Sequence, residues 1–387
     1  MDIMEYQARD LFEQAGLPVK KGVSADSVDA LMGLVEATPE LTYPLVCKAQ
    51  VQVGGRGKAG GIKIAENAEE LRHAAEQILG MNIKGHTVKR LMAVEKAEVT
   101  REFYLSIMLD RLSKCPLVIF SANGGMEIED VAKTNPQAVK KYPIHPLTGD
   151  VTVLANRLAA EADLIGTTAA QFVQVLEKLY TFFCSHDCLL AEINPLAIDT
   201  AGNIFALDGK VTVDDSALYR QSEASAFKAL LSQQDHPLVL DAATHNFLYI
   251  PCDREGTIAV TSNGSGMLMS CIDRIHDQGM KVCAALDLGG GATNERIKEA
   301  VRIISSAENA RAVLINIFGG ITRCDEVAMG IRLAKTEYRV ELPIIVRFEG
   351  TNKEKGLEIS ADLDNVIFAD GLIAGVDELV KRKELLV

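Results

Sequence analysis

The periodicity of hydrophobic and polar positions changes near residue 240 of the chain. After that point, short apolar runs alternate regularly with glycine-containing loops and with segments of helical periodicity. The apolar runs cover residues 257–262, 282–288, 312–318, 342–348 and 366–369. Five successive strand–loop–helix units predict an open, mostly parallel sheet with helices on both faces. We therefore place a doubly wound α/β domain over residues 241–387.

The pattern before residue 240 is less regular and favours hairpins over parallel crossovers. An amphipathic helix is predicted over residues 4–14 and a long helix over residues 168–184. Alternating apolar runs predict three pairs of antiparallel strands, at residues 44–53 with 61–65, 103–109 with 117–122, and 189–198 with 204–210. We interpret residues 1–240 as a separate α+β domain, with the polar stretch 222–245 as the linker region.

The composition excludes several classes of protein. With 387 residues the chain is long enough for about two or three domains, and 48% hydrophobic with 24% charged residues is a globular composition. A net charge of −13 disfavours nucleic acids and anionic membranes as partners, because their phosphates repel an acidic surface. No apolar run approaches the roughly 20 residues that a membrane helix requires.

Cysteine usage and the amino terminus indicate a cytoplasmic protein. The eight cysteines are scattered without a CxxC motif, as expected for reduced thiols. The first residues are polar and have neither the apolar region of a signal peptide nor the character of a transit peptide. We therefore expect a cytoplasmic location, or a mature form whose targeting segment is absent.

A glycine-rich loop follows the strand at residues 44–53. Its sequence GRGKAG, at residues 55–60, matches GxGxxG. A dinucleotide site requires a helix after the loop, however, and residues 61–65 have the alternation of a strand. The segment does not match a Walker A loop either. We predict that the loop closes over phosphates with its amides and with Arg56; a plain hairpin turn is the alternative.

Lys48 lies on the strand that leads into this loop. Residues of a strand alternate between its faces, so Lys48 shares a face with Gln50 and Gln52. The neighbouring residues are apolar, and a buried lysine requires an anion beside it. We therefore expect Lys48 to meet an anion.

Three oxygen-bearing side chains converge on a second hairpin. Glu192 and Asn194 are two positions apart and share a face of their strand. If the hairpin turns about Ala201, Asn194 stands opposite Asp208, at a distance of roughly 5 Å between Cβ atoms. Oxygen ligands without sulfur or imidazole suit Mg²⁺ that is shared with substrate phosphates. The alternative is an exposed polar face of a one-sided sheet.

Three loops of the second domain follow strands and open helices. Their sequences are NGSG at residues 263–266, GGGATNE at 289–295 and GGITRCD at 319–325. A helix amino terminus presents free amides and a partial positive charge, which favour an anion. Helix capping and tight turns are the alternative explanation.

In their order along the chain, these segments resemble the β subunits of succinyl-CoA synthetase. The matching segments are YQAR, KAQVQVGGRGKAGGIK, VEKAEVTREFYLSI, LLAEINPLAI, LDGK, TSNGSGM, DLGGGAT and NIFGGITRCD. They extend from the first helix to the C-terminal part of the chain. The resemblance implies an ATP-grasp nucleotide-binding domain over residues 1–240 and a flavodoxin-like CoA-ligase domain over residues 241–387.

The resemblance also implies a set of site residues. Nucleotide phosphates would bind to Lys48, Gly55, Arg56 and Gly57, the base and ribose to the region of Glu95, Glu98 and Glu102, and Mg²⁺ to Asn194 and Asp208. Glu192 would lie beside the chemistry as a catalytic residue. The substrate and phosphate contacts of a second site would be Asn263, Gly320, Ile321 and Thr322.

The implied activity is that of an acid–CoA ligase of the tricarboxylic acid cycle. Nucleoside triphosphate, succinate and CoA would give succinyl-CoA, nucleoside diphosphate and phosphate, with ATP/ADP or GTP/GDP as the nucleotide. An α subunit would supply the CoA site and a transiently phosphorylated histidine. The alternatives are a β subunit of a malate– or citrate–CoA ligase, a catalytically silent nucleotide-binding subunit, and a stand-alone ATP-grasp ligase.

Overall fold

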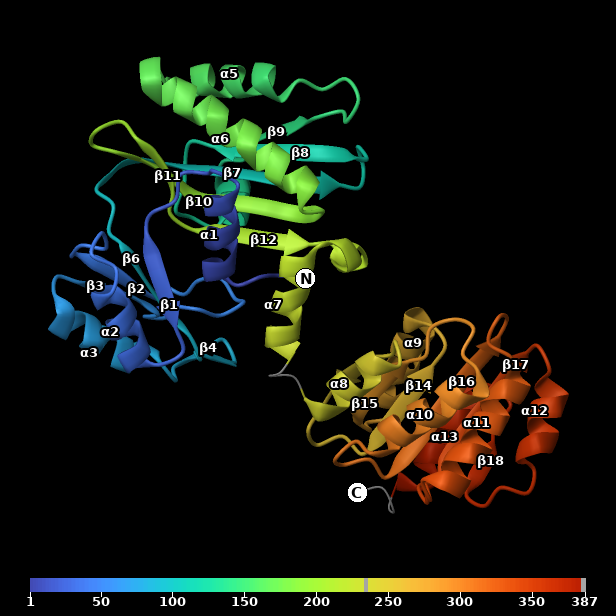
Figure 1. The fold of residues 1–387 in the computed structure, drawn as a ribbon. Coiled ribbons are helices and arrows are strands. Elements are labelled where there is room, and N and C mark those ends of the chain that lie inside the picture. Colours follow the sequence, from blue (N-terminus) through green and yellow to red (C-terminus); the bar gives the residue numbers. More distant parts are fainter. Residues whose placement is uncertain (233–235, 384–387) are drawn as a thin grey trace. The chain divides into compact units, whose positions relative to one another are not determined.

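The computed structural model describes residues 1–232 and 236–383 (Figure 1). The chain divides into two compact units, Met1–Leu231 and Ser232–Val387. This division lies slightly before the domain boundary that the sequence pattern indicates at residue 240, and that boundary stays a prediction. The linker region predicted over residues 222–245 includes this division and contains helices α7 (Ser222–Ser232) and α8 (Pro237–Thr244); residues 233–235 lie outside the described part.

The first unit begins with a small antiparallel sheet in the strand order β1-β6-β2-β3. Helices α2 and α3 pack on it and bury an apolar core that includes Leu31, Leu45 and Leu71. Ser27 and Asn67 cap these helices by accepting bonds from backbone amides. The elements are β1 (Gly22–Ala25), α2 (Val28–Glu36), β2 (Leu45–Ala49), β3 (Ile62–Ala65), α3 (Ala68–Ile78), β6 (Leu91–Glu95) and the separate hairpin β4 (Asn82–Ile83) with β5 (His86–Thr87).

The second sheet of this unit has the order β11-β10-β7-β8-β9, and β12 also pairs with β10. The elements are α1 (Glu5–Gln14), β7 (Val99–Asp110), β8 (Cys115–Ser121), α4 (Ile128–Thr134), η1 (Pro136–Ala138), β9 (Lys140–Pro143), α5 (Val151–Glu161), α6 (Gly166–Ser185), β10 (Cys188–Asp199), β11 (Ile204–Ala206), β12 (Gly209–Val213) and η2 (Asp215–Arg220).

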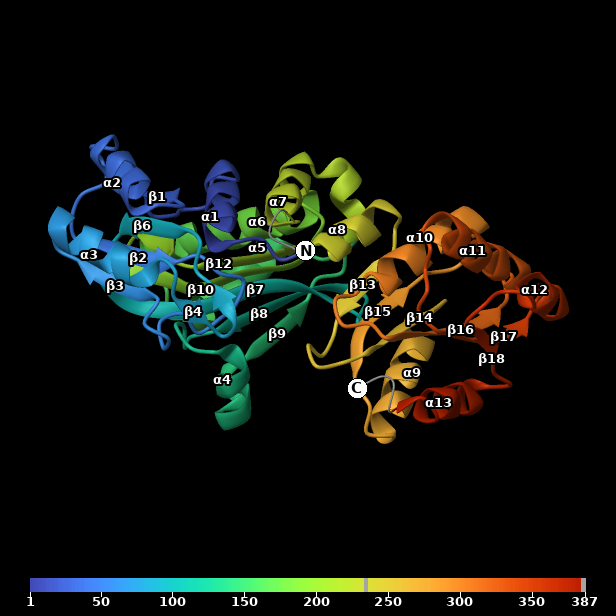
Figure 2. The ribbon, with the colours of Figure 1, turned by 90° about the horizontal axis from the view of Figure 1, so that it is seen from below.

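Alternation along β7 divides this second sheet into two different faces. Phe103, Leu105 and Ile107 are buried in the core beneath α5 and α6, so Tyr104 and Ser106 point to the opposite face. Figure 2 shows α6 on one side of β7 and β10 and α4 on the other. The sheet therefore offers polar side chains on the face away from α6, and the candidate site lies on that face.

The second unit is built on one mixed sheet in the order β13-β15-β14-β16-β17-β18. All neighbouring strands are parallel except β13, which pairs antiparallel with β15. The five parallel strands follow the flavodoxin-like order 2-1-3-4-5, which confirms the predicted doubly wound sheet. The elements are β13 (Leu248–Pro251), β14 (Ile258–Ser262), α9 (Ser265–Asp277), β15 (Val282–Asp287), α10 (Asn294–Ser305), β16 (Ala312–Gly319), α11 (Cys324–Glu337), β17 (Ile344–Gly350), α12 (Lys353–Ser360), β18 (Val366–Phe368) and α13 (Leu372–Val380).

Helices cover both faces of this sheet. One core gathers residues of α10 and α11 against one face, and a smaller core gathers residues of α9 and α13 against the other. Strands that are buried on both faces read as continuous apolar runs, as Ala312–Ile315 does in β16. Because all the parallel strands point the same way, the loops that follow them meet at one edge, where ligands of such sheets bind.

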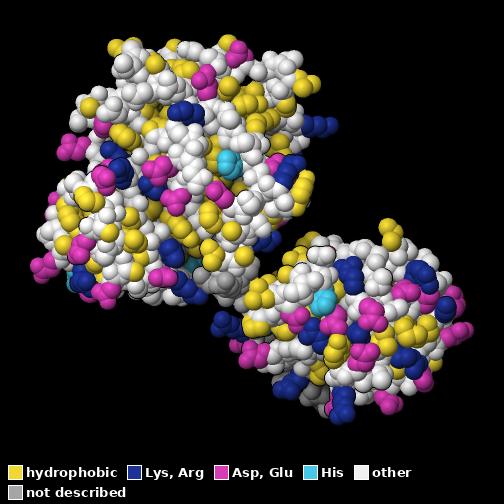
Figure 3. Space-filling model, viewed as in Figure 1, with side chains coloured by type: hydrophobic (Ala, Val, Ile, Leu, Met, Phe, Trp, Pro, Cys, Tyr) yellow, Lys and Arg dark blue, Asp and Glu magenta, His cyan; other side chains and the backbone are white. Residues whose placement is uncertain are grey.

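Acidic and basic side chains are interspersed on the face of each unit shown in Figure 3. On that face they do not form one large basic patch, in line with the net charge of −13. Among the described residues, no helix is both long enough and apolar enough to cross a membrane.

Candidate functional site

The glycine-rich loop joins two antiparallel strands, as its sequence predicts. Lys48 on β2 pairs with Ile62 on β3, so the chain returns directly as a strand after the loop, without the helix of a dinucleotide site. The Gly61 amide donates to the Arg56 carbonyl at 2.9 Å, which folds the loop back on itself. Gly55 and Gly60 both have φ near +80°, a conformation that glycine adopts without steric cost. The loop is therefore shaped by its glycines to turn Arg56 inward.

Arg56 and Lys48 meet two carboxylates, those of the buried Glu5 and the partly exposed Asp208. One Arg56 nitrogen donates to Asp208 Oδ2 at 2.6 Å, and another donates to Glu5. Lys48 Nζ lies 2.7 Å from Glu5 Oε1 and donates to the Leu207 carbonyl at 2.9 Å. The side chain of Glu5 is only 4% exposed. The anion that the sequence predicts beside Lys48 is thus supplied by the protein itself.

Burial and pairing act differently on the two carboxylates of this network. Burial opposes ionisation of Glu5, but Lys48 and Arg56 outweigh it and lower the pKa of Glu5 to about 2. Burial raises the pKa of Asp208, and the negative charge of Glu5 raises it further against the influence of Arg56. Glu5 is consequently the fixed anion of the network, and Asp208 is the group that gains most from another cation.

The second hairpin has the register that the sequence predicts. Leu196 pairs with Ala206 and Ile193 with Gly209, a register in which Asn194 faces Asp208. The backbone amide of Asn194, on β10, donates to the backbone carbonyl of Asp208 at 3.1 Å. Asp208 lies between β11 and β12, so this bond joins that segment to β10.

The side chain of Asn194 is fixed by the loop that follows β8. Its Oδ1 accepts a bond from the Gly125 amide at 2.9 Å, and its Nδ2 donates to the Met126 carbonyl at 3.0 Å. Asn194 is therefore held beside Asp208 by its backbone, and its side-chain amide is oriented by the loop at Gly125 and Met126.

Glu192 lies on the same face of β10, between two other strands. It pairs with Ser106 on β7 and with Lys210 on β12. The Tyr104 hydroxyl donates to Glu192 Oε2 at 2.8 Å. Burial raises the pKa of Glu192, and the bond from Tyr104 offsets only part of this effect. Tyr104 and Ser106 were not predicted as site residues; the only signal for them in the sequence is polarity at alternate positions of an apolar strand.

Two adjoining pockets surround these residues. A polar pocket of about 560 Å³ is lined by the glycine-rich loop together with Glu192, Asn194, Asp208 and Lys210. An apolar pocket of about 250 Å³ is lined by Lys48 together with residues such as Phe12, Val94 and Met92. Glu5, Asp208 and Gly209 line both.

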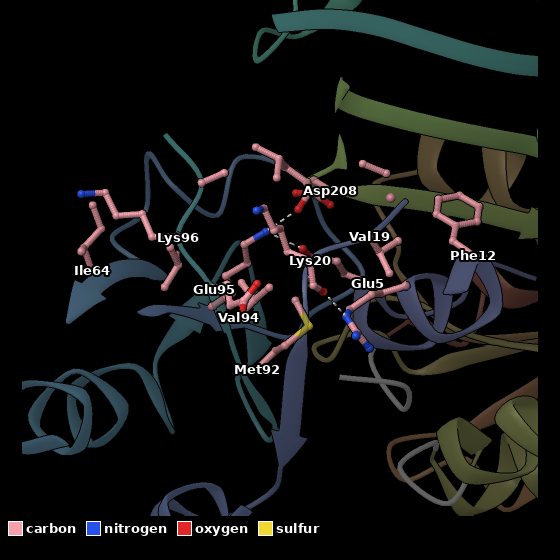
Figure 4. A pocket seen from close by; sticks show the side chains of 17 residues that line it. Glu5, Phe12, Val19, Lys20, Ile64, Met92, Val94, Glu95, Lys96 and Asp208 are labelled. Carbon is pink, nitrogen blue, oxygen red and sulfur yellow. Dashed lines mark hydrogen bonds and ion pairs between the residues drawn. The ribbon is translucent and has the colours of Figure 1, made fainter. Parts of the chain in front are cut away.

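The pair of pockets has the composition that a nucleotide requires. Figure 4 shows Phe12, Val19 and Met92 around the apolar pocket, with Asp208 at its upper side. An apolar recess suits a base, and charged side chains with backbone amides suit phosphates.

The residues expected around the base and ribose divide into two groups. Glu95 lines the apolar pocket, together with Lys96 and Ala97. Glu98 and Glu102 are exposed and line neither pocket. The structure thus brings Lys48, Gly55, Arg56, Gly57 and Glu95 to the pockets but leaves the two other glutamates outside. The apolar residues Phe12, Val19, Val94 and Met92 were missed, because their sequence pattern is that of ordinary core residues.

Asn194 and Asp208 fit a magnesium ion that is completed by phosphate and water. They provide an amide oxygen and carboxylate oxygens, which are ligands of a kind that Mg²⁺ accepts. Within the described residues there is no group of three or more His, Cys, Asp and Glu side chains that could hold a metal. A site with few protein ligands is usual for Mg²⁺ bound with a nucleotide, since phosphates supply further oxygens.

In the second unit, the loops after the strands are joined by neutral hydrogen bonds. Asn263 Nδ2 donates to the Phe318 carbonyl at 2.9 Å, and Asn263 Oδ1 accepts from the Phe318 amide at 3.0 Å. The Gly291 amide donates to Thr322 Oγ1 at 3.0 Å. Thr322 is buried, whereas Ile321 is 84% exposed.

The predicted residues of the second site therefore come together at one edge of the sheet. Asn263 follows β14, and Gly320, Ile321 and Thr322 follow β16, directly beside it. Helix α11 begins two residues after Thr322, and Asp325 in its first turn is bound by Arg323 and Asn352. With that carboxylate already paired, the loop amides are the groups that remain for an anion.

Comparison with protein families gives two matches along the chain. Residues 2–198 match the model of the ATP-grasp domain, and residues 261–377 match that of the CoA-ligase domain. Curated relatives include the succinate–CoA ligase [ADP-forming] subunit β of Chloroflexus aurantiacus, which is 43% identical over 382 residues, 98% of each chain. The protein of the same description from Rubrobacter xylanophilus is 41% identical over 364 residues, 94% of this chain and 93% of the relative.

A solved structure extends the likeness to the fold. The ATP citrate lyase from Methanothrix soehngenii, determined in complex with citrate and coenzyme A, matches with a TM-score of 0.78. The match covers 98% of this chain and 99% of that chain at 20% sequence identity. At this identity the likeness supports the order and architecture of the two units only.

Proposed function

Because this chain belongs to the family of succinate–CoA ligase [ADP-forming] β subunits, we propose that it is the nucleotide-binding half of a two-subunit acid–thiol ligase that acts on succinate. In this proposal the enzyme couples cleavage of ATP to ADP with formation of succinyl-CoA, in the tricarboxylic acid cycle. The phosphoryl group passes through a histidine of the partner α subunit, which also carries the CoA site.

The observation that carries the proposal is the convergence of Lys48, Arg56, Asn194 and Asp208 beside an apolar recess. Arg56 and Asp208 are 152 positions apart in the chain, yet their side chains are in direct contact. Cations and magnesium-type oxygen ligands next to an apolar pocket are what a nucleotide triphosphate requires.

In the proposed mechanism each of these residues has a distinct task. Lys48 and Arg56 bind nucleotide phosphates, and Asn194 and Asp208 hold Mg²⁺, which neutralises charge on the phosphates. Glu192, oriented by the Tyr104 hydroxyl, accepts a hydrogen bond from one ring nitrogen of the incoming histidine. This leaves the other ring nitrogen free to attack the phosphorus atom. The apolar pocket near Glu95 takes the base; GTP/GDP is the alternative nucleotide.

A partner subunit enters the proposal because the acceptor is missing from the site. Among the described residues, no histidine lines either pocket. The amides near Asn263, Gly320, Ile321 and Thr322 offer a second place for a phosphorylated group, at the edge of the sheet in the second unit. We further propose a cytoplasmic location, which the eight unpaired cysteines support.

Co-expression with an α subunit from the same organism tests the function. The purified complex is assayed with succinate, malate and citrate, each with ATP and with GTP, and acyl-CoA and nucleoside diphosphate are measured. We expect succinyl-CoA and ADP as the principal products, and none from this chain alone. Preference for malate or citrate would assign the chain to a related ligase. Acyl-CoA formation by the isolated chain would overturn the two-subunit mechanism.

A further inference from the structure

A buried carboxylate lies where phosphates are proposed to bind, which is unfavourable on charge alone. Glu5 lines both pockets, and its side chain is 4% exposed. A negative charge in such a place repels a nucleotide phosphate, and the repulsion is strong because little water screens it. Such a residue requires a compensating role.

The geometry shows what Glu5 touches. One of its oxygens accepts from Lys48 Nζ at 2.7 Å, and the other accepts from Arg56 and, at 3.2 Å, from Gln50 Nε2. Gln50 in turn accepts from the Tyr6 amide at 2.9 Å, which ties the start of helix α1 to the end of β2. Glu5 is therefore itself held in place while it binds both cations.

Arg56 stands between two carboxylates. One guanidinium nitrogen binds Glu5, and a different one binds Asp208 at 2.6 Å. The two bonds are independent, so the bond to Asp208 can be released while the bond to Glu5 persists. Two carboxylates and two cations leave the network without net charge.

We propose that Glu5 is a positioning residue that keeps Lys48 and Arg56 in place, so that the Arg56 nitrogen now bound to Asp208 becomes available to a nucleotide phosphate once Mg²⁺ binds that carboxylate. This inference rests on the proposed nucleotide function of the site. In this inference the start of helix α1 contributes to phosphate binding, because Glu5 holds the cationic side chains that contact the phosphates.

Neutralising Glu5 should change nucleotide affinity in opposite directions, depending on whether Glu5 positions the two cations or only repels the phosphates by its charge. If Glu5 acts on the nucleotide only through its charge, Glu5→Gln removes a repulsion and strengthens binding. If Glu5 holds the two cations, the same substitution leaves Arg56 paired with Asp208 alone. Arg56 then competes with Mg²⁺ for that carboxylate, and binding weakens. We expect the second result.

Calorimetric titration of the full chain with ADP tests the proposal. At a Mg²⁺ concentration that gives half-maximal ADP binding to the unmodified chain, Glu5→Gln is expected to raise the Kd of ADP roughly tenfold, as expected for losing hydrogen bonds between charged groups. The Mg²⁺ concentration that gives half-maximal ADP binding is also expected to rise. A loss of packing alone would not produce this second change.

Glu13→Gln is the matched control, because Glu13 lies on the same helix with a 54% exposed side chain and pairs with Arg9 at 3.2 Å. It is expected to bind ADP like the unmodified chain. Glu5→Asp keeps the charge but shortens the side chain, so it provides the same test if Glu5→Gln does not fold. It is expected to weaken ADP binding as well.

The outcomes distinguish this inference from the function on which it rests. Unchanged or tighter ADP binding by a folded Glu5→Gln variant would overturn the positioning role and leave the nucleotide site intact. If Glu5→Gln does not fold, unchanged binding by Glu5→Asp would overturn it equally. If the unmodified chain binds neither ADP nor GDP, the proposed function itself fails, and the inference fails with it.

Discussion

The two units offer anions different kinds of contact. In the first unit, Arg56 brings a full positive charge to the polar pocket, and Lys48 brings another to the adjoining apolar pocket. In the second unit, the loops that contain Asn263 and Thr322 are joined by neutral bonds, and the nearby Arg323 is already bound to Asp325. The first unit thus uses side-chain cations, whereas the second has backbone amides at the start of a helix.

This difference affects what each site needs in order to fold. Buried cations are costly without a partner, so the first unit supplies Glu5 and Asp208 as counter-charges. Helix termini carry their partial charge without any ionised group and require no such partner. Substitutions of the charged residues in the pockets of the first unit should therefore change nucleotide binding strongly, whereas substitutions in the second unit should leave it unchanged.

The largest effect is expected for Asp208→Asn, which removes a carboxylate of the proposed magnesium site. We expect kcat of the two-subunit enzyme to fall more than roughly 100-fold, since even residues behind metal ligands change metal affinity by 10–100-fold. Asp29→Asn is the control, because Asp29 pairs with Arg72 on the surface with an 87% exposed side chain. Steady-state kinetics and a thermal melt measure both variants. Turnover close to that of the unmodified enzyme would contradict the metal assignment.

A smaller loss is expected for Arg56→Ala. The guanidinium can contact phosphate in both the ground state and the transition state, so KM for the nucleotide should rise and kcat should fall, together roughly 10- to 100-fold in kcat/KM. Arg72→Ala removes the other member of the surface pair Arg72–Asp29 and is expected to change neither constant. Binding of NAD without binding of ATP or GTP would instead assign the loop to a dinucleotide.

Tyr104→Phe tests whether Glu192 is oriented by the hydroxyl that binds it at 2.8 Å. We expect kcat to fall roughly tenfold with little change in nucleotide KM, because the lost bond is to a charged group that does not hold the nucleotide. Tyr142→Phe is the control; Tyr142 also bonds a carboxylate, that of Glu161, but at the surface. A rise in KM without a fall in kcat would show that Tyr104 acts on nucleotide binding.

The smallest effect is expected in the second unit, for Thr322→Val. This nearly isosteric change removes the acceptor of the Gly291 amide and should cost about 1 kcal/mol of stability. Acyl-CoA formation should slow only a few-fold, and ADP binding to the first unit should not change. Thr336→Val on helix α11 controls for the loss of a hydroxyl. Weakened ADP binding in Thr322→Val would contradict the separation of the two sites.

Much of the fold was predictable because its signals are local. The alternation of apolar runs and glycine loops after residue 240 predicts the parallel sheet that the structure confirms. The turn about Ala201 predicts the register that brings Asn194 opposite Asp208, because the residues of a hairpin pair in order away from the turn. The linker region predicted at 222–245 contains the division between the two units, but the helices α7 and α8 within it were not predicted, because its polar composition gives no clear helical periodicity.

By itself, the sequence determined the order of elements, the glycine-rich loop between antiparallel strands and the facing pair of Asn194 and Asp208. Only the tertiary structure decided that Glu5 is the anion beside Lys48, 43 positions away, and that Tyr104 holds Glu192 across two strands. It also decided that Glu98 lies outside the pockets while Phe12 and Met92 line one. Periodicity reports the face on which a residue lies, but not which distant element packs against that face; burial and charge pairing between elements select that partner.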